Sequence, residues 1–316
     1  MAKPGRSCPR HYRYSPAVFA RAADIKAQSL YVVGGLYGNP FALETVLDLA
    51  RREGAMLVFN GDFNWFDADP AGFRALNGTV LQHAALRGNV ETELAGEDAG
   101  AGCGCGYPEW VGDAEVERSN RIIERLRETA RGFPDLRGRL GSLPTHLVAE
   151  VGGLRVGIAH GDAESLAGWQ FSQEALRERP ERAQALLAGA AVDVFACTHT
   201  CLPVMQDFAT PRGMALIVNN GAAGMPNFRD TRFGLATRIA NVPSMEALYG
   251  ARLGAIVVEA VPVRYDHEAW LARFDRVWPA GSPASLSYRK RIASGPGYDV
   301  EQALRTSSNG ALSRAA

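Results

Sequence analysis

The chain has 316 residues, of which 47% are hydrophobic and 22% charged, an ordinary composition for a globular protein with a sizeable core. Its 34 basic and 34 acidic side chains cancel, so no global field directs it to nucleic acid or to an anionic membrane, and we expect neither as a partner. No run of about 18 apolar residues is present, and the sequence therefore predicts no membrane span.

The first residues, Met1 to Cys8, lack the apolar stretch of a secretory signal. Five cysteines without such a signal indicate a reducing compartment, with free thiols or a metal site. We therefore predict a cytoplasmic location. Residues 1–28 are polar with scattered aromatic side chains, and we interpret them as an N-terminal extension that wraps the surface.

The next segment predicts a βαβ unit. Residues 30–33 and 56–59 are short apolar runs that end in Gly-Gly and Asn-Gly, as strands entering tight turns do. Between them, apolar residues recur at helical spacing up to Arg51 and Arg52. Such a unit implies a parallel strand pair with a right-handed crossover. Residues 79–86 are predicted to form a third strand.

The remaining elements follow in order. Alternating glycines around Cys103 and Cys105 indicate a loop, and Gly152-Gly153 indicates the turn of a hairpin. We predict helices at 115–131, at 174–187 and from about 267, and strands at 145–151, 154–159, 192–196, 215–218 and 254–265. The tail after Arg305 is expected to be disordered. A βαβ opening followed by antiparallel hairpins predicts two packed sheets with helices outside.

Four polar residues each follow an apolar strand: Asp62, Asn89, His160 and His199. Loops at the carboxyl ends of strands converge at one edge of an α/β sheet, where such proteins build their sites. A carboxylate, an amide oxygen and two imidazoles suit Mn, Fe, Zn or Ni better than Ca or Mg. These residues therefore predict a transition-metal site.

The same residues lie in short sequence motifs that resemble those of the calcineurin-like metallophosphoesterase superfamily, in particular its bacterial branch of small phosphodiesterases. The motifs occur in the family's order between Leu30 and Asp266: Gly35-Leu36-Tyr37-Gly38-Asn39 in place of Asp-x-His-Gly-Asn, Gly61-Asp62, Arg87-Gly88-Asn89-Val90-Glu91, His160-Gly161, Thr198-His199-Thr200-Cys201-Leu202-Pro203, and Asn219-Asn220-Gly221-Ala222.

The resemblance implies an α/β fold, a four-layer α-β-β-α sandwich of the metallophosphoesterase type. The fold would occupy residues 29–266, with residues 1–28 as an N-terminal extension and residues 267–316 as a C-terminal helical addition with a disordered tail. It also implies one metal ion held by Asp62, Asn89, His160 and His199, with the first three as catalytic residues.

The family's first metal would need ligands at positions 35, 37 and 201, where this chain has Gly35, Tyr37 and Cys201. Glycine has no side chain, and a phenol is normally protonated near neutral pH. Of the three, only Cys201 offers a good ligand, as a thiolate, and we include it among the candidate metal ligands. Losing two ligands removes the two-metal clamp on the attacking and leaving oxygens, so a second metal is doubtful.

Structural explanations remain open for each of these residues. Asp62 and Asn89 are also common turn residues, and the two histidines could be buried structural groups. Tyr37 could simply pack where a metal would lie. Free cysteines often behave as small buried hydrophobic residues. Alternatively, Cys103, Cys105 and Cys201 could hold a soft metal, or Cys201 could be an activated thiolate; Cys197 adds a fourth thiol nearby in sequence.

These observations favour a metal-dependent hydrolase of a phosphoester or phosphodiester, acting on a small phosphorylated substrate or nucleotide through an atypical, single-metal site. The first alternative is a catalytically inactive protein of the same fold that binds a nucleotide, a metal or a partner protein. The second alternative is a repurposed site built on the cysteines.

Overall fold

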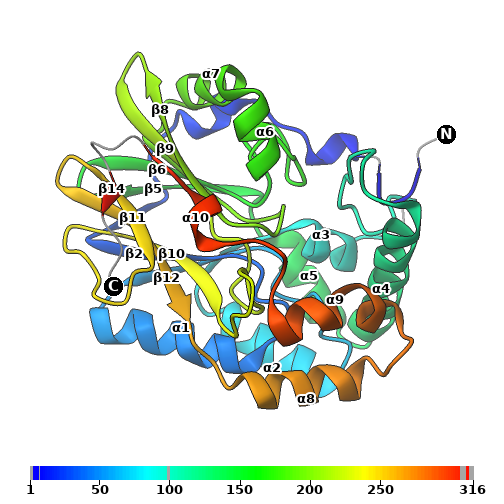
Figure 1. Ribbon diagram of the computed structural model, residues 1–316. Helices are drawn as coiled ribbons and strands as arrows, with labels where there is room; N and C mark the ends of the chain where they lie inside the picture. Colours follow the sequence, from blue (N-terminus) through cyan, green and yellow to red (C-terminus); the bar gives the residue numbers. More distant parts are fainter. Residues whose placement is uncertain (1–2, 7, 98–99, 307–310, 313–316) are drawn as a thin grey trace.

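The structure is a computed structural model that describes residues 3–6, 8–97, 100–306 and 311–312. Two seven-stranded sheets pack face to face and are covered by helices on both outer sides (Figure 1). The strands of the first sheet, in spatial order, are β14 (Ala311–Leu312), β11 (Tyr249–Leu253), β12 (Ile256–Val263), β10 (Gly234–Ala240), β2 (Ser29–Val33), β3 (Met56–Asn60) and β4 (Ala84–Leu86). The strands of the second sheet are β1 (Ile25–Ala27), β5 (His146–Val151), β6 (Leu154–Ala159), β7 (Val194–Cys197), β9 (Gly213–Asn219), β8 (Val204–Thr210) and β13 (Leu304–Arg305).

The helices form the outer layers and one end of the molecule. In Figure 1, α1, α2 and α8 lie below the first sheet, α6 and α7 lie at the top beside the second sheet, and α3, α4, α5 and α9 gather at one end. The helices are α1 (Pro40–Glu53), α2 (Pro70–Val80), α3 (Asn89–Ala95), α4 (Asp113–Arg131), α5 (Pro134–Ser142), α6 (Gln173–Glu178), α7 (Pro180–Ala190), α8 (His267–Val277), α9 (Pro283–Ser294) and α10 (Val300–Ala303). No helix in the described ranges is both long enough and apolar enough to cross a membrane.

Alternation along the strands explains the layers. In β2, Leu30 and Val32 point into the core between the sheets, whereas Tyr31 and Val33 pack against the helical layer. Successive side chains of a strand point to opposite faces, so a strand that is apolar throughout can be covered on both sides. The predicted four-layer α-β-β-α sandwich is therefore confirmed.

The opening βαβ unit is confirmed in detail. Strands β2 and β3 are parallel, with Leu30 opposite Met56, and α1 connects them. Asn39 caps α1 by accepting hydrogen bonds from the amides of Phe41 and Ala42, and Gly54 ends the helix in the left-handed conformation. The hairpin of β5 and β6 turns at Gly152-Gly153, as predicted.

Three predictions of local structure were correct only in part. Residues 79–86 contain only the short strand β4, because the capping carboxylate of Asp69 and the first-turn Pro70 begin a helix that continues to Val80. The predicted helix at 174–187 is two helices, since Pro180 keeps Arg179 out of the helical conformation. The predicted strand at 254–265 begins only at Ile256, because Gly254 turns the chain from β11 into β12.

The two terminal segments are part of the sheets. Residues 25–27 form the edge strand β1, and Tyr12 and Phe19 are fully buried, so the N-terminal segment is more than a surface wrap. Leu304 and Arg305 pair with β8. Ala311 and Leu312 pair with β11, where disorder was predicted, because the edge of β11 offers hydrogen-bonding groups to a further strand. Residues 307–310 and 313–316 lie outside the described residues, and disorder there stays a prediction.

Candidate metal centre

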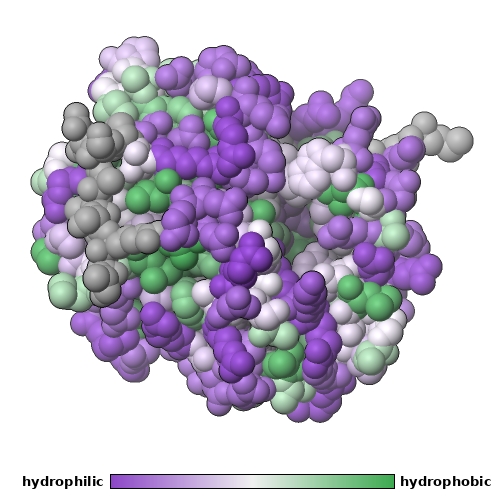
Figure 2. All heavy atoms as spheres, in the orientation of Figure 1, coloured by the Kyte–Doolittle hydropathy of each residue, from purple (hydrophilic) through white to green (hydrophobic). Residues whose placement is uncertain are grey.

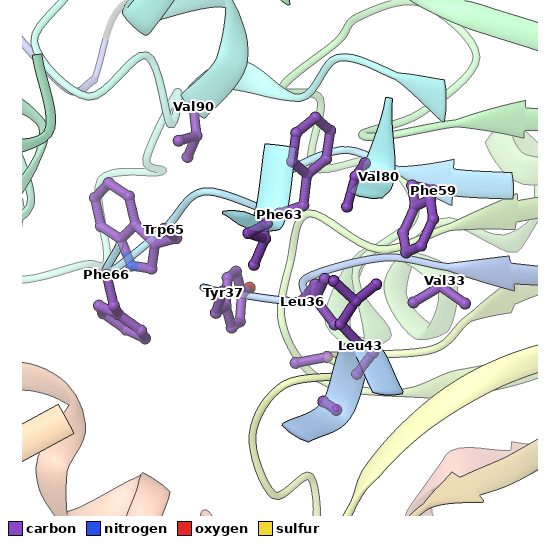
Figure 3. Close-up of a cluster of buried hydrophobic side chains, with 14 of the residues drawn as sticks. Val33, Leu36, Tyr37, Leu43, Phe59, Phe63, Trp65, Phe66, Val80 and Val90 are labelled. Atoms are coloured by element: carbon purple, nitrogen blue, oxygen red, sulfur yellow. The ribbon is translucent and has the colours of Figure 1, made fainter. Parts of the chain in front are cut away.

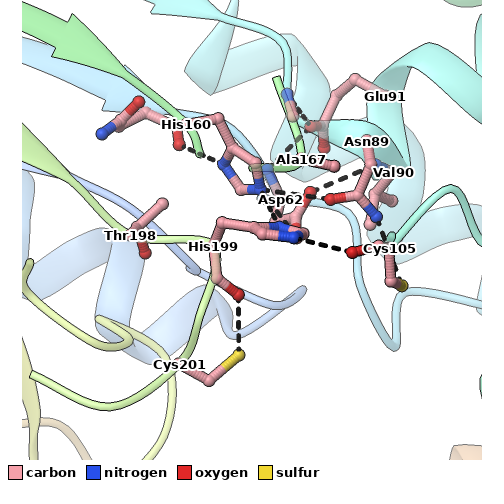
Figure 4. A network of polar contacts seen from close by, with 12 residues as sticks. Asp62, Asn89, Val90, Glu91, Cys105, His160, Ala167, Thr198, His199 and Cys201 are labelled. Atoms are coloured by element: carbon pink, nitrogen blue, oxygen red, sulfur yellow. Dashed lines mark hydrogen bonds and ion pairs between the residues drawn. The ribbon is translucent and has the colours of Figure 1, made fainter. Parts of the chain in front are cut away.

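The carboxyl ends of strands from both sheets meet at one edge of the sandwich. Asp62 follows β3, Asn89 begins the helix after β4, His160 follows β6 and His199 follows β7. These four side chains come together in the buried network of Figure 4. Among the described residues, Asp62, His160 and His199 are the one group of three or more histidine, cysteine or acidic side chains whose potential ligand atoms all lie within 4.8 Å of one another.

Nε2 of His160 lies at the centre of the cluster. It is 3.2 Å from Oδ2 of Asp62, 3.2 Å from Oδ1 of Asn89 and 3.2 Å from Nδ1 of His199. The opposite nitrogen of the ring, Nδ1, is 2.9 Å from the carbonyl oxygen of Asn60 and donates its hydrogen to it. The Nε2 lone pair is thus directed at the other three groups.

The loop at residues 103–105 orients two of these groups. Nε2 of His199 donates to the carbonyl oxygen of Cys105 at 2.9 Å, which leaves Nδ1 of His199 unprotonated and facing His160. The amide nitrogen of Asn89 donates to the carbonyl oxygen of Cys103 at 2.9 Å, which turns Oδ1 of Asn89 toward the cluster. The Cys-Gly-Cys segment therefore supports the site through its backbone carbonyls.

The cluster consists of four converging acceptors. Burial disfavours an imidazolium at His160, but the Asp62 carboxylate, the carbonyl of Asn60 and the charge of Glu91 together outweigh burial and raise the pKa of His160. Burial and the neighbouring His160 lower the pKa of His199 to about 4, so His199 is neutral. A proton on Nε2 of His160 would face three acceptors and could serve them only in part. A cation at their common centre satisfies all of them, so the donor set fits a metal ion.

Glu91 holds the loops of the site in place. It is fully buried, and its carboxylate accepts hydrogen bonds from the backbone amides of Asp62 at 2.7 Å, Gly88 at 3.0 Å and Asn64 at 3.1 Å. Burial, together with the charge of Asp62, raises the pKa of Glu91. Sequence reasoning did not assign Glu91 this role, although a glutamate at the third position of a helix is a known capping signal.

Close packing of the two loops requires glycine at position 88. A Cβ atom there would lie 2.3 Å from Oδ1 of Asp62, which also accepts a hydrogen bond from the amide of Val90 at 3.1 Å. Asp62 itself has a φ of 52°, and Tyr37 and Cys201 have φ values of 56° and 63°. Non-glycine residues in this conformation are uncommon and concentrate at functional sites.

The Gly35, Tyr37 and Cys201 group has a different chemistry. The Tyr37 hydroxyl lies 3.0 Å from Sγ of Cys201, and the thiol in turn contacts the carbonyl oxygen of His199 at 3.3 Å. Figure 3 shows the Tyr37 ring packed among Leu36, Phe63 and Phe66. Burial raises the pKa of both Tyr37 and Cys201, so both groups keep their protons. A Cβ at position 35 would lie 3.0 Å from Cζ of the Tyr37 ring.

The cysteines do not form a cluster of their own. Within the described part of the chain, no group of three potential ligands includes Cys103, Cys105 or Cys201. Cys197 is buried and its thiol contacts the carbonyl oxygen of Val218 at 3.5 Å. The soft-metal cluster considered from the sequence is therefore absent from these residues.

A pocket of about 310 Å³ lies against the centre and is lined by Asp62, Asn89, His199 and the Tyr37–Cys201 pair among others. The space-filling view shows a recess on this face, between α6 and the helices α4 and α9 (Figure 2). Among the described residues that line the pocket, Arg291 of α9 is the one arginine. Its guanidinium donates hydrogen bonds to the carbonyl oxygens of Cys201 at 2.5 Å and Pro226 at 3.2 Å. Sequence reasoning missed Arg291, because no local pattern connects it with the other loops.

Solved structures of known proteins share this architecture. A metallophosphoesterase from Sphaerobacter thermophilus is 18% identical, covers 85% of this chain and 100% of its own, and superimposes with a TM-score of 0.54. A hypothetical protein from Pyrococcus horikoshii OT3 is 16% identical, covers 86% of this chain and 100% of its own, and has the same TM-score of 0.54. No family model and no curated protein matches the sequence. The chain thus has the fold of the metallophosphoesterases, as the motifs around Asp62, Asn89, His160 and His199 predicted.

Proposed function

We propose that the protein is a phosphoester or phosphodiester hydrolase with one transition-metal ion, bound by Asp62, Asn89, His160 and His199. The observation that carries this proposal is the convergence of four acceptor atoms. The carbonyls of Asn60, Cys103 and Cys105 orient His160, Asn89 and His199, and the amide of Val90 donates to Asp62. Their nitrogen and oxygen donors fit Mn, Fe, Zn or Ni.

The chain's own groups have separate tasks in this proposal. Asp62 supplies the negative charge that attracts the ion, and Glu91 fixes the loop that carries Asp62. When bound, such an ion supplies Lewis-acid polarisation of a phosphoryl oxygen. Arg291 places a positive charge at the wall of the pocket. Hydrolysis then adds water across a P–O bond, with the oxygen to phosphorus and a proton to the departing alcohol.

We further propose that the second metal position of two-metal relatives is closed in this chain. The Tyr37 ring stands where a side chain at position 35 would extend, and the Tyr37 hydroxyl and Cys201 thiol are hydrogen-bonded to each other. Both groups keep their protons because burial raises each pKa, and neither is then a good metal ligand. Cys201, predicted from the sequence as a candidate ligand, has no ligand role in this proposal.

The same pair favours a second candidate function, that of a catalytically inactive protein that binds a metal and a phosphorylated ligand. A repurposed cysteine site is disfavoured, because burial raises the pKa of Cys201 instead of lowering it. Cytoplasmic location, predicted from the sequence, remains part of the proposal.

Elemental analysis of protein purified without a metal-affinity column tests the metal centre. We expect about one transition metal per chain, and loss of that metal in the His199→Ala variant. Wild-type metal content in His199→Ala would contradict the assignment. Turnover of bis(p-nitrophenyl) phosphate with added Mn²⁺, abolished in the same variant, would establish hydrolysis; a full complement of metal without turnover would favour the inactive binding protein.

A further inference from the structure

Aromatic rings form a large part of the lining of the pocket beside the candidate metal centre. The pocket volume of about 310 Å³ suits a small ligand. Six of its lining side chains are aromatic: Tyr37, Trp65, Tyr107, Trp110, Trp169 and Tyr288. The proposed chemistry at phosphorus uses none of these rings. They therefore call for an explanation in terms of the part of the ligand that is not phosphate.

Trp110 is exposed and yet held in place. Its side chain is 66% exposed, an unfavourable position for a large apolar ring. Trp110 lies in a turn closed by a hydrogen bond from the amide of Val111 to the carbonyl oxygen of Pro108 at 3.1 Å. The Arg6 guanidinium binds both ends of this turn, donating to the carbonyl oxygens of Pro108 at 2.8 Å and Val111 at 2.7 Å. An exposed ring on a fixed turn is typical of a recognition residue.

Trp169 connects this ring to the metal centre. Its indole Nε1 donates to the carbonyl oxygen of Cys105 at 3.0 Å, the same oxygen that accepts from His199. The ring lies 5.6 Å from Trp110 at an angle of 86° and 5.6 Å from His199 at 77°. The edge-to-face contact with Trp169 leaves Trp110 66% exposed, so part of the Trp110 ring surface is open to a planar ligand.

Charged groups in the pocket narrow the ligand class. Glu115 and Glu174 also line it, and Glu174 accepts a hydrogen bond from Gln173 at 2.6 Å. Carboxylates accept hydrogen bonds and donate none when ionised, so they favour a ring that carries N–H donors over a plain hydrocarbon ring. A nucleobase combines a flat face with such donors.

We propose that Trp110 and Trp169 bind a nucleobase of the substrate, whose phosphate then lies at the Asp62–His199 centre. The substrate class is accordingly a nucleotide ester, and the two tryptophans supply the affinity for its base. This inference rests on the proposed function for the position of the phosphate. Base recognition itself does not depend on turnover and is measured by binding.

Isothermal titration calorimetry of the purified protein with adenosine 5′-monophosphate and with ribose 5-phosphate tests the inference. The ligands are checked afterwards for hydrolysis. Stacking on one ring predicts that the nucleotide binds about tenfold more tightly than the sugar phosphate. Trp110→Leu should remove this difference and leave the affinity for ribose 5-phosphate unchanged, whereas Trp110→Tyr should retain most of it. Leu286→Ala is the matched control, because Leu286 is 64% exposed and lies outside the pocket.

Equal binding of the two ligands by the wild-type protein, or equal weakening of both by Trp110→Leu, would overturn the inference. Adenosine, which has no phosphate, separates it from the proposed function. Adenosine binding that depends on Trp110 in a protein without phosphodiesterase activity would uphold base recognition and refute hydrolysis. Hydrolysis of phosphodiesters without any preference for a base would uphold hydrolysis and refute base recognition.

Discussion

Two groups of side chains lie beside the same pocket and differ in how their hydrogen-bonding capacity is used. In the first group, Asp62, Asn89, His160 and His199 direct four acceptors to one point. In the second, Tyr37 and Cys201 satisfy each other at 3.0 Å. A cation can complete the first group, whereas it would have to displace protons in the second. Whether the polar atoms carry protons, more than how close they lie to one another, distinguishes a set of metal ligands from a packed polar pair.

The two groups differ less in backbone conformation than in side-chain chemistry. Asp62, from the first group, and Tyr37 and Cys201, from the second, all have positive φ values. Aspartate tolerates this conformation better than a bulky aromatic residue does. The two groups therefore share this uncommon backbone conformation, and the side chains they carry decide the chemistry.

The strongest test of the contrast changes one side chain in each group. Asp62→Asn should reduce metal affinity by more than the roughly 100-fold that loss of a supporting residue costs, because the variant keeps the side-chain shape and loses the only anionic ligand. Cys201→Ser, the matched change in the second group, should leave metal content at the wild-type value. Metal titration by competition with a chromogenic chelator measures both. Equal losses of metal affinity in the two variants would contradict the distinction between the two groups.

A gain of function would sharpen the contrast further. The combined substitutions Gly35→Asp, Tyr37→His and Cys201→His provide unprotonated ligands in the second group and remove the ring that blocks position 35. We expect metal content to rise from about one to about two ions per chain. Gly35→Asp alone should instead lower stability by about 1–3 kcal/mol, because its Cβ would press on the Tyr37 ring. One ion per chain in the triple variant would show that something other than these side chains closes the position.

A smaller effect is expected from Glu91, which binds the backbone amides of the loops that carry the first group. Glu91→Gln places an amide where three backbone N–H groups need an acceptor, which should cost about 1–3 kcal/mol of stability and about 10–100-fold in metal affinity. Urea unfolding and metal titration measure the two effects. Glu93→Gln is the control, because Glu93 is buried in the same helix but pairs with Arg127 and Tyr12. It should lose stability without losing metal, and parallel losses in both variants would contradict a specific role for Glu91.

The smallest effect concerns a carboxyl group beside the second group. Asp67 lies against Gly38, near Tyr37, and burial raises its pKa to about 7 despite the neighbouring Arg273. In the unfolded chain the group ionises near 3.8, so the folded protein binds more protons between these values and loses stability as pH rises. Asp67→Asn stays neutral, and its free energy of unfolding relative to wild type should rise by on the order of 1–2 kcal/mol from pH 4.5 to 7.5. A difference in free energy of unfolding between variant and wild type that stays constant from pH 4.5 to 7.5 would refute the raised pKa of Asp67.

The sequence predicted those parts of the site that local patterns determine. Asp62, His160 and His199 each follow an apolar strand, and strand order in an α/β sheet brings such residues together. The strand error at residues 79–86 has the opposite origin, because a run of apolar residues there fits either period and the capping carboxylate of Asp69 lies ten positions earlier.

Long-range contacts explain what the sequence did not predict. Arg6 binds the turn that carries Trp110 from more than 100 positions away, and Arg291 reaches the pocket from the far end of the chain. The part played by Cys103 and Cys105 was also hidden, since their backbone carbonyls act on the site while their thiols suggested another role. Side-chain identity carries no signal for a function of the main chain.

The carbonyl oxygen of Cys105 receives hydrogen bonds from both His199 and Trp169, at 2.9 Å and 3.0 Å. One atom thus sets the tautomer of His199 and the orientation of the Trp169 ring in the pocket. If His199 holds an ion as proposed, any ligand that shifts Trp169 should redistribute this shared hydrogen bond and change the affinity of His199 for that ion. Thermodynamic reciprocity then requires the ion to change the affinity for that ligand by the same factor. Titrations of metal with and without nucleotide, and of nucleotide with and without metal, should return a single coupling constant.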